Sequence, residues 1–99
     1  MSKSQTAHDA TKAQDELQQR LGHDQVHVKA YGSHLLIQME VNGERDTVAR
    51  ITRIDAKTYG VAFRTHSGRW EPLPEQGSLE EIVVLVVEDL GPYLLPDNY

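Results

Sequence analysis

The sequence of 99 residues contains no cysteine. This absence excludes a disulfide framework, a thiolate nucleophile, a zinc ribbon and an iron–sulfur cluster. Long hydrophobic runs are also absent, because the longest, Ile82 to Val87, has six residues, whereas a membrane-spanning helix needs about 20. Nor do the first ten residues contain the apolar core of a secretory signal. We therefore expect a cytoplasmic protein with no membrane association.

Positive charge is missing from one third of the chain, and aromatic residues are scarce at 6%. Residues 70–99 contain seven acidic residues and no lysine or arginine, whereas residues 44–69 contain six basic and three acidic residues. The formal net charge of -5 disfavours non-specific binding to nucleic acid or to an anionic membrane. The basic excess within residues 44–69 is still compatible with one basic face.

No repeat and no linker rich in proline, glycine or serine divides the chain, so we expect one domain over residues 6–99. Four apolar residues at three- and four-residue spacing predict a helix from about Thr6 to Leu21, ending at Gly22. These residues are Ala10, Ala13, Leu17 and Leu21. Thr6 and Asp9 resemble a capping box, which predicts a helix start at this point and a disordered N-terminus over residues 1–5.

From Gln25 to Leu73 the hydrophobic period changes to two, as in a half-buried antiparallel sheet. Asn42-Gly43 is a strong hairpin signal, because both residues tolerate positive φ. The predicted strands cover about residues 26–31, 35–41, 44–54, 59–64 and 69–71. Pro72 and Pro74 are expected to end strand pairing, since proline has no N–H to donate. The prediction is a sheet of four to five strands in meander order.

The last element is ambiguous, because Ile82 to Val87 has the β-branched composition of a strand. Ser78 followed by Glu81 has the form of a capping box, however, and Gly91-Pro92 is a stop signal. We therefore predict a helix from Leu79 to Leu90. Its expected core stripe is Leu79, Ile82, Val83, Val86 and Leu90. Because other faces of this helix are also apolar, either the tail around Tyr93 to Leu95 or a second subunit should cover it.

The predicted fold class is therefore α+β, with the order α-β-β-β-β(-β)-α and both helices on one face of an antiparallel sheet. The opposite face of the sheet is expected to be exposed to solvent or to bind a partner. The binding residues expected there are His27, Lys29, Tyr31, His34, Arg50, Arg64, Arg69 and Trp70. Such a face suits an anionic partner, either RNA or an acidic protein segment. Alternatively, the arginines pair across strands with Glu40, Asp46, Asp55 and Glu71.

The tripeptide Gly32-Ser33-His34 opens a strand after a helix and one preceding strand. Over about residues 13–51, this order of elements resembles the HicA-type toxins, which are small metal-independent ribonucleases of double-stranded-RNA-binding-like fold. The resemblance implies that His34 acts as general acid/base. That family follows its third strand with a helix and is usually basic, whereas this chain is acidic and continues with a strand pattern.

Other constellations carry no recognisable chemistry. His23 and His27 are four residues apart, but at a strand entry this spacing does not give the shared face that it gives on a helix. A loop from His66 to Pro72 contains groups that would suit the rim of a small-molecule pocket, yet no residue orients His66 for catalysis. We therefore predict a non-enzymatic binding module without metal or cofactor. The alternatives are the ribonuclease and a structural or regulatory subunit that dimerises through its C-terminal helix.

Overall fold

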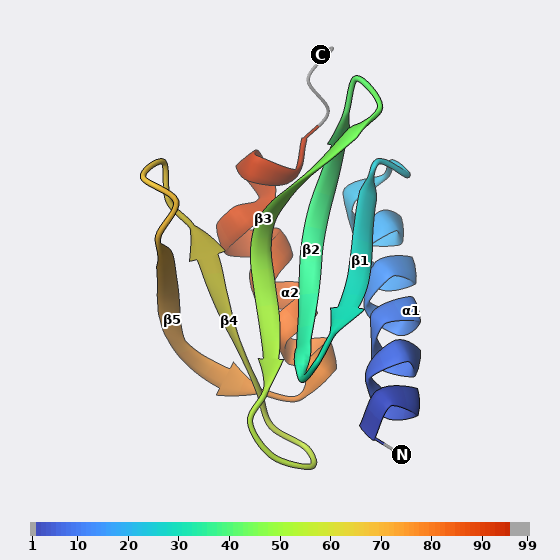
Figure 1. The fold of residues 1–99 in the computed structure, drawn as a ribbon, viewed down its shortest axis with the longest axis vertical. Coiled ribbons are helices and arrows are strands. Elements are labelled where there is room, and N and C mark those ends of the chain that lie inside the picture. Colours follow the sequence, from blue (N-terminus) through green and yellow to red (C-terminus); the bar gives the residue numbers. More distant parts are fainter. Residues whose placement is uncertain (1, 96–99) are drawn as a thin grey trace.

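The computed structural model describes residues 2–95, which form two helices on one face of a five-stranded sheet (Figure 1). The elements are α1 (Ser2–Leu21), β1 (Val26–Tyr31), β2 (His34–Val41), β3 (Glu44–Arg53), β4 (Tyr59–Arg64), β5 (Trp70–Gly77), α2 (Leu79–Leu90) and the 3-10 helix η1 (Gly91–Leu94). All neighbouring strands are antiparallel, in the order β1-β2-β3-β4-β5. The predicted α+β meander is confirmed.

The start of α1 differs from the prediction. The helix begins at Ser2 rather than at Thr6, so residues 2–5 are helical where we expected disorder. Thr6 and Asp9 are buried within α1 and do not cap it. Asp9 instead accepts two hydrogen bonds, from Tyr59 Oη at 2.7 Å and from Gln5 Nε2 at 3.0 Å. Asp9, which the sequence places in an apparent capping box, therefore anchors the helix to β4.

The hydrophobic core lies between the sheet and the two helices. Its largest fully buried side chains are Leu17, Ile37, Ile51, Ile82, Leu94, Val26, Val83 and Val86. Alternate residues of β1, β2 and β3, together with Tyr59 and Val61 of β4, supply the sheet side, which is the pattern expected for a sheet with one buried face. The opposite residues of the strands therefore point away from both helices.

The C-terminal helix has the predicted bounds, cap and core stripe. Ser78 Oγ accepts from the Glu81 N–H at 3.2 Å, and Glu81 Oε1 accepts from the Ser78 N–H at 2.9 Å. These reciprocal bonds satisfy two N–H groups that a helix start leaves without partners. The strand-like composition of residues 82–87 is overridden because the cap, the stop signal and the core stripe all favour a helix.

The tail after α2 folds back onto the core. Leu94 has 0% of its surface exposed, whereas Leu95 is 43% exposed. His23 Nε2 donates to the Leu94 carbonyl at 2.6 Å, while its Nδ1 accepts from the Gln25 N–H at 3.1 Å. Leu94 of the predicted tail therefore joins the core that α2 shares, while Tyr93 and Leu95 stay exposed. No helix of residues 2–95 is long and apolar enough to cross a membrane.

Strand β5 extends farther than predicted, because Pro72 and Pro74 lie inside it and not at its end. Pro72 still pairs with Ala62, after an irregularity between Gly60 and Ala62 shifts the register. Proline is tolerated here because β5 is an edge strand, so its missing N–H leaves no neighbouring strand without a donor. The same prolines make the outer edge of the sheet a poor template for further pairing.

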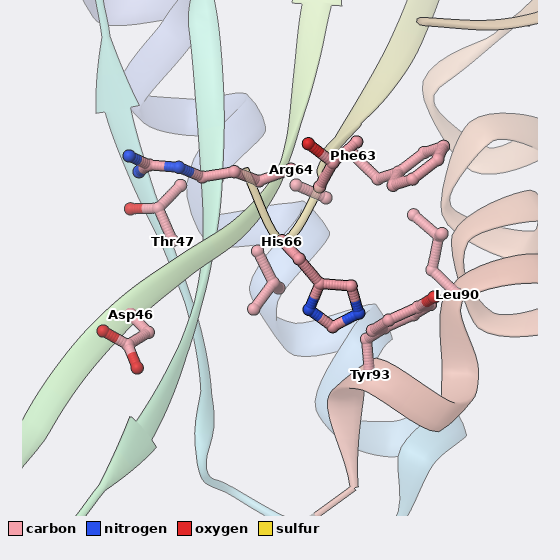
Figure 2. Close-up of a pocket in the computed structure, with 10 residues that line it drawn as sticks. Asp46, Thr47, Phe63, Arg64, His66, Leu90 and Tyr93 are labelled. Carbon is pink, nitrogen blue, oxygen red and sulfur yellow. The ribbon is translucent and has the colours of Figure 1, made fainter. Parts of the chain in front are cut away.

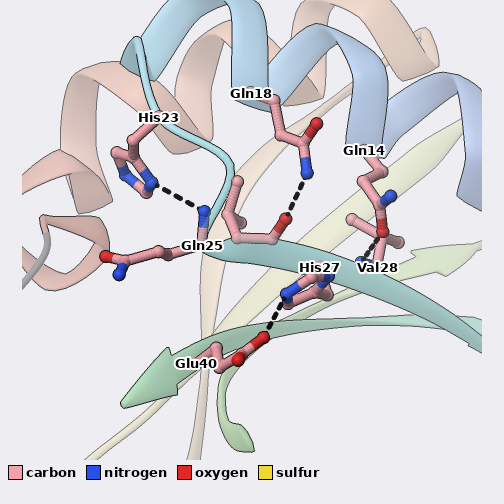
Figure 3. A network of polar contacts seen from close by, with 8 residues as sticks. Gln14, Gln18, His23, Gln25, His27, Val28 and Glu40 are labelled. Atoms are coloured by element: carbon pink, nitrogen blue, oxygen red, sulfur yellow. Dashed lines mark hydrogen bonds and ion pairs between the residues drawn. The ribbon is translucent and has the colours of Figure 1, made fainter. Parts of the chain in front are cut away.

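The other outer edge, along β1, is covered by two glutamine side chains of α1 (Figure 3). Gln14 Oε1 accepts from the Val28 N–H at 2.9 Å, and Gln18 Nε2 donates to the Val26 carbonyl at 3.0 Å. These side chains bond the N–H of Val28 and the carbonyl of Val26, with which an added strand would otherwise pair. Both outer edges of the sheet are therefore closed to strand addition, each by a different device.

Candidate anion-binding face

The face of the sheet opposite the helices, here called the open face, carries most of the residues predicted for binding. Residues directly opposite one another in an antiparallel pair share a face. The register pairs Lys29 with Leu36, Leu36 with Arg50, Arg50 with Ala62, and Ala62 with Pro72, which makes one row across the sheet. Flanking rows contain Tyr31 with His34 and Arg64 with Trp70.

Seven of the eight predicted binding residues lie on the open face, and the eighth lies beside it. The seven are His27, Lys29, Tyr31, His34, Arg50, Arg64 and Trp70. Arg69 is in the exposed turn before β5, where its backbone N–H donates to Thr65 Oγ1 at 3.2 Å. It lies one residue outside β5, so its strand phase does not fix the direction of its side chain.

Two arginines and one tryptophan form a cluster on the open face. The Arg50 guanidinium carbon lies 4.5 Å from the centre of the Trp70 ring, and that of Arg64 lies 6.0 Å from it. Both distances are within the range of cation–π attraction. Arg50 Nε is buried without a hydrogen-bond partner. The cluster thus holds two positive charges on one indole ring.

The expected pairing of these arginines with carboxylates does not occur. Between described residues, the structure contains the ion pairs Lys12–Glu80 at 3.4 Å and His27–Glu40 at 2.9 Å, and neither includes Arg50 or Arg64. Glu40, the acidic residue of β2, instead bonds His27 across the strand pair (Figure 3). The positive charge of the cluster is therefore uncompensated by a bonded carboxylate, which makes it attractive to an external anion.

The separation of charge along the sequence becomes a separation in space. Apart from Glu71, which follows Trp70 in β5 and pairs with Phe63, the exposed acidic residues of residues 70–95 are carried by the second half of β5 and by α2. They include Glu75, Glu80, Glu81, Glu88 and Asp89. These five acidic residues therefore lie on β5 and α2, while Lys29, Arg50 and Arg64 lie on the open face.

His34 lies at the edge of this face. Its Nδ1 is 2.9 Å from Thr52 Oγ1, and partial burial together with the charge of Arg50 lowers its pKa below the usual value. A lowered pKa favours a neutral imidazole at pH 7, which suits a general base and not a general acid. After β3 the chain continues with β4, whereas the HicA-type family has a helix at this point.

A cavity of about 480 Å³ opens on the helix side of the sheet, between β3 and the end of α2 (Figure 2). Its apolar wall includes Phe63 and Leu90, and its rim includes Asp46 and Tyr93. His66 and Tyr93 also line this cavity (Figure 2). The sequence indicated His66 as a residue at the rim of a pocket. It did not indicate the residues of β3 that form the wall, because their position depends on a register irregularity next to Val48.

No cluster of three or more His, Cys, Asp or Glu residues that would hold a metal ion is present within residues 2–95. Comparison with protein-family models, with curated proteins and with solved structures finds no match to this chain. The function is therefore inferred from the chemistry of the open face and its surroundings.

Proposed function

We propose that the protein is a non-enzymatic binding module, whose open face binds an acidic segment of another protein. The observation that supports this function is the cluster of Arg50 and Arg64 on Trp70, to which no carboxylate of residues 2–95 is bonded. An arginine fork matches the two oxygens of a carboxylate, so acidic side chains are suitable ligands. We place this module in the cytoplasm, as the sequence suggests.

An acidic protein segment fits this face better than single-stranded RNA does. Sequence-tolerant RNA binding uses aromatic rings on which successive bases stack. Trp70 already stacks with Arg50, while Tyr31 is 64% exposed on the far strand of the sheet. These rings are separated by four strand spacings, about 19 Å, and consecutive bases do not span that distance. The open face therefore provides positive charge, but it lacks a row of unstacked aromatic rings on which successive bases could lie.

The proposal predicts that Arg64→Glu weakens binding of a labelled hexaglutamate peptide about tenfold or more. The substitution replaces a favourable charge-assisted contact by repulsion, and one such contact is worth roughly 1.5–3 kcal/mol. Fluorescence anisotropy measures the dissociation constant at low and at raised salt. Added salt should weaken binding to the wild type, because the interaction is electrostatic.

The matched control is Lys57→Glu, which makes the same change in net charge at an exposed turn between β3 and β4. We expect this variant to bind within about twofold of the wild type, since it lies off the open face. Equal weakening by both substitutions would mean that net charge alone governs binding, and would contradict the proposal. A short RNA of mixed sequence serves as the second probe, and tighter binding of RNA would overturn the choice of partner.

The ribonuclease alternative gives a separate expectation for His34. If the protein is a binding module, wild type and His34→Ala leave a labelled single-stranded RNA equally intact, because no chemistry depends on the imidazole. Gel analysis after prolonged incubation measures this directly. Cleavage by wild type that disappears in a folded His34→Ala variant would replace the binding module by a nuclease.

A further inference from the structure

One internal stretch of the sheet lacks a strand on one side. Residues 44–47 of β3 pair with β2, but β3 pairs with β4 only from Ala49 onward. Figure 1 shows the β2–β3 hairpin extending beyond the end of β4. Residues 44–48, here called the free edge, therefore present one side of their backbone with which no strand of residues 2–95 pairs. A five-residue edge is about 16 Å long.

This free edge differs from the two outer edges of the sheet. Glutamines of α1 cover the edge of β1, and prolines interrupt the edge of β5. Neither device is present on residues 44–48, which contain no proline and whose backbone bonds to no side chain of the described part of the chain. An uncovered strand edge is a template for pairing with another chain.

The cavity lies directly beside the free edge. Residues 46–49 of β3 form one wall, and Phe63, Leu90 and Tyr93 supply apolar and aromatic surface opposite. A strand that paired with residues 44–48 would direct alternate side chains into this space, because side chains of a strand alternate between faces. The volume of about 480 Å³ accommodates a large apolar side chain.

On the side of the sheet away from the cavity, the surroundings of the free edge are basic. Arg45 and Thr47 pair with Glu40 and Gln38, which places them on the open face, and Arg64 ends β4 there. Glu40 lies opposite Arg45 on the same face and is bonded to His27, so Arg45 and Arg64 together still leave an excess of positive charge there. Side chains of an added strand that point to this face would meet positive charge, so carboxylates are complementary to it.

We propose that the acidic partner binds as an additional β-strand along residues 44–48, with carboxylates on the open face and apolar side chains in the cavity. This inference rests on the proposed function, which supplies the acidic character of the partner. It adds that the partner binds as a strand and that its acidic and apolar side chains alternate. RNA has no such alternation of side chains. The free edge would pair with the backbone of the partner strand, the cavity would hold its apolar side chains, and the basic residues would bind its carboxylates.

The test uses the full chain and the peptide acetyl-Glu-Val-Glu-Phe-Glu-Val-Glu-amide, with two N-methylated forms. One form is methylated on the glutamates after the first, the other on the three apolar residues. In a strand, these two sets of N–H groups point to opposite edges. We expect one form to bind about tenfold or more weakly, and the other within about threefold of the parent peptide.

Amide hydrogen exchange identifies where the peptide binds. Strand addition should slow exchange within residues 44–48, because N–H groups of the free edge gain acceptors. Replacing the central phenylalanine of the peptide by alanine should weaken binding severalfold if its side chain fills the cavity. As a matched protein variant, Tyr93→Ala changes the cavity rim at a side chain that is 57% exposed, and it should weaken the parent peptide while leaving hexaglutamate binding unchanged.

Three outcomes would overturn strand addition. In the first, both methylated peptides bind like the parent while Arg64→Glu still weakens them, which leaves the proposed function intact. In the second, the parent peptide does not bind at all, and hexaglutamate then tests the open face separately. In the third, the free protein is a dimer whose amides at residues 44–48 are already protected, so a second copy occupies the edge.

Discussion

Replacing Leu94 by alanine is expected to lower the free energy of unfolding by about 2–5 kcal/mol, the range for removing a large apolar side chain from a packed core. Leu94 is fully buried, and its carbonyl is held by His23. The side chain belongs to η1, so the result measures how far the tail after α2 completes the core. Urea denaturation followed by circular dichroism gives the difference.

The neighbouring residue supplies the control. Leu95→Ala removes the same atoms from a side chain that is 43% exposed, and a change within about 1 kcal/mol is expected. Equal effects of the two substitutions would contradict the placement of Leu94 in the core. A large effect of Leu95→Ala alone would indicate that a second subunit covers the tail in solution.

Tyr59→Phe is expected to lower the free energy of unfolding at neutral pH by about 1–3 kcal/mol, the cost of leaving a buried acceptor without a partner. The phenol donates to Asp9 Oδ2 at 2.7 Å, and both residues are buried. Burial, followed by the hydrogen bond to Asp9 and the charge of Asp9, raises the pKa of Tyr59 to about 12. Asp9 keeps the bond from Gln5, which limits the loss.

The same contact predicts a dependence of stability on pH. Because the pKa of Tyr59 is about 12 in the folded protein and about 10 in the unfolded chain, the folded state holds this proton more tightly. Its stabilising contribution is complete below pH 10 and is lost as pH rises from about 10 to about 12. Urea denaturation at pH 9 and pH 11 should show a smaller decline for Tyr59→Phe than for wild type.

Tyr31→Phe is the control, because its ring is 64% exposed and belongs to the open face. Its stability is expected to follow that of wild type at both pH values, within about 0.5 kcal/mol. If the decline from pH 9 to pH 11 were the same in wild type and in Tyr59→Phe, the buried contact with Asp9 would not carry the pH dependence.

The order of elements was predictable because periodicity, turn residues and caps agree along most of the chain. The period of two from Gln25 onward defined the strands, and Ser78 with Glu81 defined the start of α2. The errors have local causes. Thr6 and Asp9 have side chains suited to a cap, but both lie inside a longer helix, where Asp9 bonds Tyr59 of β4. Pro72 and Pro74 lack the N–H of a ladder residue, yet an edge strand accommodates them, so pairing continues past them.

The candidate site was predictable as a face but not as a set of contacts. Strand phase indicated which side chains share the open face, and the register confirms this for Arg50, Arg64 and Trp70. Their stacking, and the bonding of Glu40 to His27, depend on neighbouring strands and on rotamers. The free edge depends on where β4 ends relative to β3, which no local pattern encodes.

The most direct test of binding by the open face is a titration of isotope-labelled protein with hexaglutamate, followed by amide and side-chain NMR shifts at low and raised salt. We expect the shifts to map to Lys29, Arg50, Arg64 and Trp70, and to diminish as salt is added. Shifts confined to α2, or the absence of any salt-dependent shift on the open face, would contradict the account.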